Sequence, residues 1–155
     1  MRVRVTIAAP PERVWGVLTD LASYRMWHPL LELLDGPDAL CLEPGATVRF
    51  RLSGGVAGEH EFEAAVIDVA KPRFLAWEGG DREQFLGRHQ WTLTPVDGGT
   101  EVLEEEIFSG TLARTVLDAN RTAMYTDYER IAAAFKAVVE GARLLDPEEP
   151  FEDVR

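Results

Sequence analysis

The chain has 155 residues, 46% of them hydrophobic and 28% charged, which fits one soluble globular domain and excludes both a disordered chain and a disulfide scaffold. Five acidic residues and one arginine in residues 146–155 contribute −4 to the formal net charge of −11, and the remaining −7 disfavours binding of nucleic acid through a basic face. We therefore expect one ligand-binding domain over residues 1–145, followed by an acidic flexible tail at 146–155.

The first 30 residues predict one strand and two short helices. Apolar residues at every second position of 3–7 indicate a half-buried strand. Pro11 suits the first turn of a helix, which the apolar spacing extends over 11–19. A second short helix is expected over 21–27, ending before Pro29, because a residue that precedes proline avoids the helical conformation.

From about residue 38 to residue 109 the pattern is that of antiparallel strands, about six in number. Polar and apolar residues alternate, and glycine-rich turn signals such as 54–58 and 97–99 separate the runs. The clearest strands are predicted at 47–52, 60–69, 73–78, 84–94 and 100–109.

The last third changes to a period near 3.6, which predicts one long amphipathic helix over 113–141 with Gly141 at its end. This order of elements predicts an α+β fold in which a curved antiparallel sheet of about seven strands wraps around the long C-terminal helix. The two short helices follow the first strand.

Several short motifs follow one another along residues 3–140. They are Ala9-Pro10, Val14-Trp15, Asp20, Trp27 with Pro29, Pro44-Gly45, Trp77, Gly87-x-His89, Gly98-Gly99-Thr100 and Glu106-x-Phe108-x-Gly110. In this order they resemble the START-like (SRPBCC) superfamily, which includes polyketide cyclases and lipid carriers. The resemblance implies a helix-grip fold with an elongated apolar cavity for a hydrophobic small molecule between sheet and helix. It does not select an activity, because such folds host many functions.

The hairpin at Asp97-Gly98 decides which side chains face the long helix. A two-residue turn places His89 opposite Glu106, with Glu104 on the same face of the sheet. If that face lines the cavity, His89 and Glu106 form a dyad, and the carboxylate raises the pKa of the imidazole. With Glu104 beside them, these are the candidate catalytic residues for acid–base chemistry on a phenol or a carbonyl.

A three-residue turn is the alternative. It turns Leu103 and Ile107 inward and both glutamates toward water, which burial of apolar area favours. The Glu-x-Phe-x-Gly pattern of the resembling family favours the two-residue turn instead, so the sequence leaves both registers open. In the two-residue register, outward Leu103 and Ile107 form an apolar patch suited to a homodimer.

Large aromatic residues and one stripe of the long helix supply candidates for ligand binding, although each also fits ordinary core packing or structural hydrogen bonding. They are Trp27, Phe50, Phe62, Trp77, Trp91, Phe108, Asn120, Met124 and Tyr128.

Other reactive side chains are interpreted as structural. His28 is expected on the surface, with a place near the mouth of the cavity as the alternative, and His60 has no evident partner. Cys41, the single cysteine, is expected as a small buried apolar residue. The glutamates between positions 101 and 106 are expected on a solvated strand edge. This scatter of histidines has no usual metal-ligand spacing, so neither a metal nor a cofactor is expected.

We therefore expect a protein that binds a hydrophobic, polycyclic or polyketide-type small molecule, with a cyclase/aromatase-type enzyme of secondary metabolism as the catalytic version. The alternative is a non-catalytic carrier, or a protein that sequesters a toxic metabolite for self-resistance. A co-chaperone-like interaction module is a third class that the resemblance allows. The N-terminal strand pattern and the single cysteine favour a cytoplasmic protein without membrane insertion, either a monomer or a homodimer.

Overall fold

The computed structural model describes residues 1–38 and 41–141. Within these residues, seven strands form one antiparallel sheet in the order β1-β7-β6-β5-β4-β3-β2. The strands are β1 (Arg2–Ile7), β2 (Leu31–Asp35), β3 (Thr47–Leu52), β4 (His60–Ala70), β5 (Phe74–Asp81), β6 (Phe85–Val96) and β7 (Gly99–Ser109). The predicted acidic tail lies outside the described residues.

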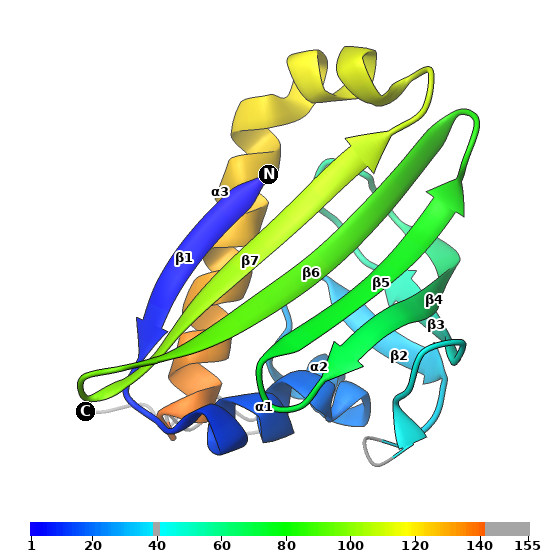
Figure 1. Cartoon of the computed structure of the whole chain (residues 1–155). Coiled ribbons are helices and arrows are strands. Elements are labelled where there is room, and N and C mark those ends of the chain that lie inside the picture. Colours follow the sequence, from blue (N-terminus) through cyan, green and yellow to red (C-terminus); the bar gives the residue numbers. More distant parts are fainter. Residues whose placement is uncertain (39–40, 142–155) are drawn as a thin grey trace, which may run out of the picture.

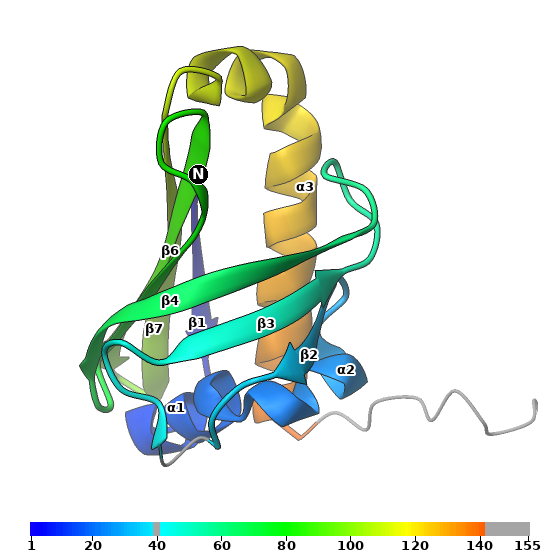
Figure 2. The same cartoon turned by 90° about the vertical axis from the view of Figure 1, so that its right-hand side faces the viewer.

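The helices are α1 (Pro11–Thr19), a short 3-10 turn (Leu21–Ser23), α2 (Tyr24–Trp27) and the long α3 (Ala113–Val139). The sheet curves around α3, and α1 and α2 lie together at the end where α3 finishes (Figures 1 and 2). This confirms the predicted α+β helix-grip fold. No helix in the described ranges is both long and apolar enough to cross a membrane.

Local chemistry explains most of the element boundaries. Pro10 is extended and Pro11 opens α1, as expected for proline in a first turn. Gly141 has a φ of +84°, the left-handed conformation that commonly ends a helix. The expected start of the strand region near residue 38 is wrong, because β2 already begins at Leu31. Its sequence, Leu-Glu-Leu-Leu-Asp, lacks strict alternation, so the period-2 signal is weak there.

The core lies between the concave face of the sheet and the helices. Residues at alternate positions of each central strand point to this face, as the pleat requires. The largest completely buried apolar members come from α1, α2, the strands and the end of α3: Ile7, Val14, Leu18, Tyr24, Val48, Phe50, Val66, Leu75, Leu93, Val102 and Val139.

The two halves of α3 are buried to different extents. In the C-terminal half, Tyr128, Ile131 and Phe135 are buried against the core. In the N-terminal half, the same stripe continues through Leu117 and Met124, but both residues are only half-buried. The sheet and the short helices α1 and α2 therefore cover the second half of α3 more completely than the first.

Candidate functional site

The β6–β7 hairpin has the two-residue turn. Val96 pairs with Gly99 and His89 pairs with Glu106, while Gly98 supplies a φ of +79° within the turn. Glu104 is consequently buried on the concave face, and Ile107 lies on the opposite face with 52% of its surface exposed. The three-residue register is therefore wrong for this chain.

The expected solvated strand edge is also wrong. β7 is paired on both sides, to β1 and to β6, so its glutamates lie inside the sheet. Glu105 on the convex face meets Arg2 at 2.6 Å, whereas Glu104 on the concave face is 4% exposed. Exposed Ile107 and half-buried Leu103 lie on the convex face, and a dimer through them stays a prediction.

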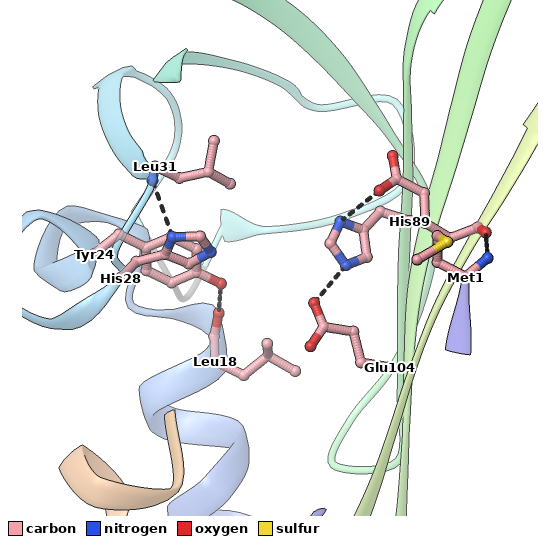
Figure 3. Close-up of polar contacts among 8 residues, drawn as sticks. Met1, Leu18, Tyr24, His28, Leu31, His89 and Glu104 are labelled. Carbon is pink, nitrogen blue, oxygen red and sulfur yellow. Dashed lines mark hydrogen bonds and ion pairs between the residues drawn. The ribbon is translucent and has the colours of Figure 1, made fainter. Parts of the chain in front are cut away.

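His89 contacts two glutamates at once. Its Nε2 is 2.8 Å from Glu104 Oε1, and its Nδ1 is 4.0 Å from Glu106 Oε2 (Figure 3). The hydrogen bond is thus made to Glu104, which lies two pairs closer to the turn, and not to the directly opposed Glu106. The side chains of all three residues are at least 82% buried.

Gly87 makes room for the carboxyl group of Glu106. A β-carbon at position 87 would lie 2.5 Å from Glu106 Oε1, so any larger residue there would displace that group. Gly87 is paired with Gly79, and Gly79 with Ala64. The space above this row of small residues is shared by the carboxyl group of Glu106 and the rings of Phe108 and Phe62, since a β-carbon at Gly87 would lie 3.5 Å from Phe108 and one at Gly79 would lie 3.3 Å from Phe62.

The pKa values of the cluster are coupled. Burial alone would lower the pKa of His89, but the hydrogen bond to Glu104 and the charges of Glu106 and Glu104 outweigh it and raise that pKa. Burial raises the pKa of Glu106, although the charge of His89 partly opposes this shift. With both pKa values raised, His89 and Glu106 each bind a proton more strongly in the folded protein than in water.

This coupling predicts a pH-dependent stability. Folded His89 keeps its proton above pH 6.5, the ordinary pKa of a histidine, so the folded state binds more protons than the unfolded chain there. We expect the free energy of unfolding to fall as pH rises from 6.5 through the raised pKa, by at most about 1.4 kcal/mol per pH unit. Urea unfolding of the native sequence and of His89→Gln between pH 6 and 9 measures the difference. A free energy with equal pH slopes in the two proteins would contradict the coupling.

Aromatic side chains surround the cluster. The His89 ring stacks on Trp91 with 4.0 Å between centroids, and Tyr128 of α3 and Trp77 of β5 lie at 5.8 Å and 6.0 Å. Trp77 in turn contacts Phe50 at 5.5 Å. The predicted site residues on β3, β5, β6 and α3 thus form one connected set of ring contacts that includes His89.

The other predicted ligand-binding residues lie at different distances from this centre. Phe62 is half-buried beside Phe50, and Phe108 is half-buried and stacks on Phe85 of β6. Trp27 is buried against Phe135, and its indole nitrogen has no hydrogen-bond partner in the described part of the chain.

The two remaining candidates belong to α3. Met124 is half-buried in the N-terminal half of the helix. Asn120 donates a hydrogen bond of 2.9 Å from its amide to the Val116 carbonyl of its own helix. In this structure Asn120 thus makes the structural contact that the sequence left as one of two alternatives.

Two open grooves run beside α3. One, of about 340 Å³, lies between β7 and the N-terminal half of α3 and is lined by Glu106, Phe108, Leu117 and Tyr125 among others. The other, of about 450 Å³, lies between β1 and the C-terminal half, where Val3, Val5 and Ala132 meet Arg2, Arg4 and Lys136. Glu106 is thus the member of the buried cluster that reaches a groove. An enclosed cavity between sheet and helix stays a prediction.

His28 was missed by the sequence reasoning. It is half-buried, not exposed on the surface, and its ring stacks on Tyr24 with 5.3 Å between centroids. Its Nδ1 accepts hydrogen bonds from the backbone of Leu30 at 3.2 Å and of Leu31 at 2.9 Å. Burial, with a smaller contribution from the charge of His89, lowers its pKa to about 3. No sequence signal distinguishes such a residue from a surface histidine next to proline.

Cys41 and His60 lie elsewhere. Cys41 is exposed, so the expectation of a buried small residue is wrong. It lies in the connection between β2 and β3, where the next residue, Leu42, is buried in the core instead. His60 is exposed at the start of β4. In residues 1–38 and 41–141 no three histidine, cysteine or acidic side chains are grouped as metal ligands.

Comparison with known proteins identifies the family. The sequence model of the polyketide cyclase/dehydrase and lipid transport family matches residues 1–140. No curated protein matches the chain.

Solved structures share the fold. Protein Ms6760 from Mycobacterium smegmatis has 17% sequence identity and a TM-score of 0.71, over 92% of this chain and 91% of its own. StfQ, a di-domain ARO/CYC from the steffimycin biosynthetic pathway, has 12% identity and a TM-score of 0.72, over 90% of this chain and 50% of its own. DynU16, from the dynemicin biosynthetic locus, has 19% identity and a TM-score of 0.67, over 93% and 48%. At these identities the likeness concerns the fold. Since the family match extends over almost all of the described residues, the chain belongs to the polyketide cyclase/dehydrase and lipid transport family.

Proposed function

We propose that this protein binds a flat, largely apolar small molecule of polycyclic or polyketide type between the concave face of the sheet and the N-terminal half of α3. The observation that carries the proposal is the buried cluster of His89, Glu104 and Glu106 inside an aromatic wall. Burying two carboxyl groups costs free energy that an apolar core would avoid. Hydrogen bonding to a ligand would account for the presence of these carboxyl groups in the core.

The uneven burial of α3 supports this location. Leu117 and Met124 carry apolar surface that the sheet covers only in part, and they lie in the half of the helix beside the groove at Glu106. A molecule that enters from this groove meets Glu106 first and can then place its apolar part against the row of small residues that includes Gly87.

The aromatic surroundings support a flat ligand. Trp77, Trp91 and Tyr128 present ring surfaces around the polar cluster, and planar molecules stack well on such surfaces. StfQ comes from the steffimycin biosynthetic pathway and DynU16 from the dynemicin biosynthetic locus. The fold that this chain shares with them agrees with a polyketide-type ligand.

A bulky residue in the partly covered half of α3 is expected to block binding. Met124→Trp adds a large ring next to the proposed site, and we expect it to weaken binding of a naphthol probe at least about tenfold. Met26→Trp is the matched control, because Met26 is 63% exposed on α2. Fluorescence titration measures both variants. Equal affinities in the two variants would place the ligand somewhere else.

The natural ligand itself can be identified directly. Native mass spectrometry of the protein purified from its own host, followed by analysis of any released compound, is expected to show a planar molecule with few charges. A bound flexible fatty acid would contradict the proposed ligand class.

The contacts of His89 favour acid–base catalysis as a second candidate function. A carboxyl group is hydrogen-bonded to one ring nitrogen at 2.8 Å and a second lies 4.0 Å from the other, so the imidazole would pass a proton from one side to the other once Glu106 or a bound hydroxyl group comes within hydrogen-bond distance. A cyclase/aromatase-type reaction needs such proton transfers. The double variant His89→Gln/Glu106→Gln is expected to bind the identified compound but to lose its turnover. Unchanged turnover in the double variant would contradict this role of His89 and Glu106, whereas no turnover by the native protein would favour a carrier or sequestering role.

A further inference from the structure

The ring of His28 is held in one orientation by contacts on two sides. Its Nδ1 accepts two backbone hydrogen bonds, from Leu30 and Leu31. Its face stacks on Tyr24 with an interplanar angle of 13°. Tyr24 is 1% exposed and donates from its hydroxyl group to the Leu18 carbonyl at 2.7 Å. Tyr24, on which the His28 ring stacks, is therefore held in one orientation as well.

These contacts determine where the ring carries its hydrogen. A nitrogen that accepts two N–H groups has no room for a proton of its own, so the neutral ring carries its hydrogen on Nε2. The pKa of about 3, lowered by burial, keeps the imidazole neutral across the physiological range. His28 therefore presents a permanent hydrogen-bond donor at its second nitrogen.

The second nitrogen lies on the side of the ring toward the buried cluster. Figure 3 shows the Nδ1 side of His28 directed to Leu31 and the opposite side directed across the interior toward His89 and Glu104. The charge of His89 also contributes to the lowered pKa of His28, which indicates that the two rings lie close enough to interact electrostatically. Among the described residues, none accepts a hydrogen bond from this second nitrogen.

We propose that His28 is a specificity-determining donor of the ligand site, and that the ligand is a hydroxyaryl ketone or similar molecule with a carbonyl oxygen toward His28 and a hydroxyl group toward Glu106. This inference rests on the proposed ligand site. It adds that the two ends of the site differ in hydrogen-bonding chemistry, because His28 offers only a donor and Glu106 offers carboxyl oxygens.

Such a site discriminates by leaving polar groups unpaired. A ligand without the carbonyl oxygen leaves the His28 N–H buried and unsatisfied, and a ligand without the hydroxyl hydrogen leaves Glu106 in the same condition. Sites built this way reject analogues that lack the matching group, here by about tenfold or more for each missing contact.

Three naphthalene probes and two matched variants test the proposal. The probes are 6-acetyl-2-naphthol, 6-isopropyl-2-naphthol, which has a similar shape without the carbonyl oxygen, and the methyl ether of the first, which lacks the hydroxyl hydrogen. In His28→Asn the side-chain oxygen takes the place of Nδ1 and keeps the Leu30 and Leu31 amides bonded, but the inward donor is lost. His60→Asn makes the same change at an exposed histidine.

We expect the native protein to prefer the acetyl probe over the isopropyl probe by about tenfold or more, and over the methyl ether by a similar factor. His28→Asn should abolish the first preference and keep the second, while His60→Asn keeps both. An unchanged carbonyl preference in His28→Asn, or none in the native protein, would overturn the role of His28 but not the proposed function. Failure of all three probes to bind would contradict the proposed function itself.

A second measurement needs no ligand. The ¹⁵N shifts of the His28 ring in the native protein should show hydrogen on Nε2 and no titration between pH 5 and 8. Hydrogen on Nδ1, or titration in that range, would overturn the inference even if a probe binds.

Discussion

Replacing Glu104 with alanine is expected to lower the free energy of unfolding at pH 7 by about 3–5 kcal/mol. The substitution leaves His89 buried, with 10% of its side chain exposed, and without its hydrogen-bond partner at 2.8 Å. An uncompensated buried charge is among the costliest single changes in a folded protein. Chemical denaturation at pH 7 measures the loss.

Two controls separate the burial of Glu104 from its charge. Glu101 lies three pairs closer to the turn, its side chain is 36% exposed and it meets Arg4 only at 3.4 Å, so Glu101→Ala should cost less than about 1 kcal/mol. The double variant His89→Leu/Glu104→Leu removes both polar groups and should recover most of the stability lost in Glu104→Ala. If Glu104→Ala were as mild as Glu101→Ala, the cluster would not be buried as described.

Replacing Gly99 with alanine is expected to lower the free energy of unfolding by about 3 kcal/mol or more. A β-carbon at position 99 would lie 2.0 Å from the carbonyl oxygen of Ile7, and this neighbour is backbone of β1 that cannot rotate away. β1 would have to shift from β7, so the amides of Val5 and Ile7 should also exchange hydrogen faster. Denaturation and hydrogen exchange measure the two effects.

The adjacent glycine provides the matched control. Gly98→Ala adds the same single carbon where no heavy atom lies within 4 Å, and its cost is only that of a positive φ, about 1–2 kcal/mol. A three-residue turn would place Gly99 in the turn and away from Ile7. A larger loss in Gly98→Ala than in Gly99→Ala would therefore contradict the register that brings Glu104 and Glu106 to the concave face.

Local patterns were sufficient for most of the fold. The alternation in β3, β6 and β7 and the 3.6-residue period of α3 arise from side chains near one another in the chain, and all four elements are found close to their predicted bounds. β2 shows where such patterns fail. Leu33 and Leu34 are both half-buried, so neither face carries a clear apolar signal.

The candidate site was predictable only in part. Pairing arithmetic placed His89 opposite Glu106, but it could not show that the His89 ring bonds to Glu104 instead. That choice depends on rotamers, and the packing of Trp91 against the ring takes part in setting them. Cys41 was misjudged for a related reason, because burial depends on what surrounds a residue and not on its type alone.

The sequence by itself determined the order of elements, the apolar face of α3 and the presence of acidic residues and one histidine on a single hairpin. Those features follow from periodicity and composition, which the chain carries in every conformation. Only the tertiary structure decided that Glu104 and Glu106 face inward and that the ring of His28 is fixed against a buried tyrosine. The first depends on contacts between residues far apart in the chain, such as the close approach of Gly99 to Ile7, and the second on the burial of Tyr24 in the core, where it is 1% exposed.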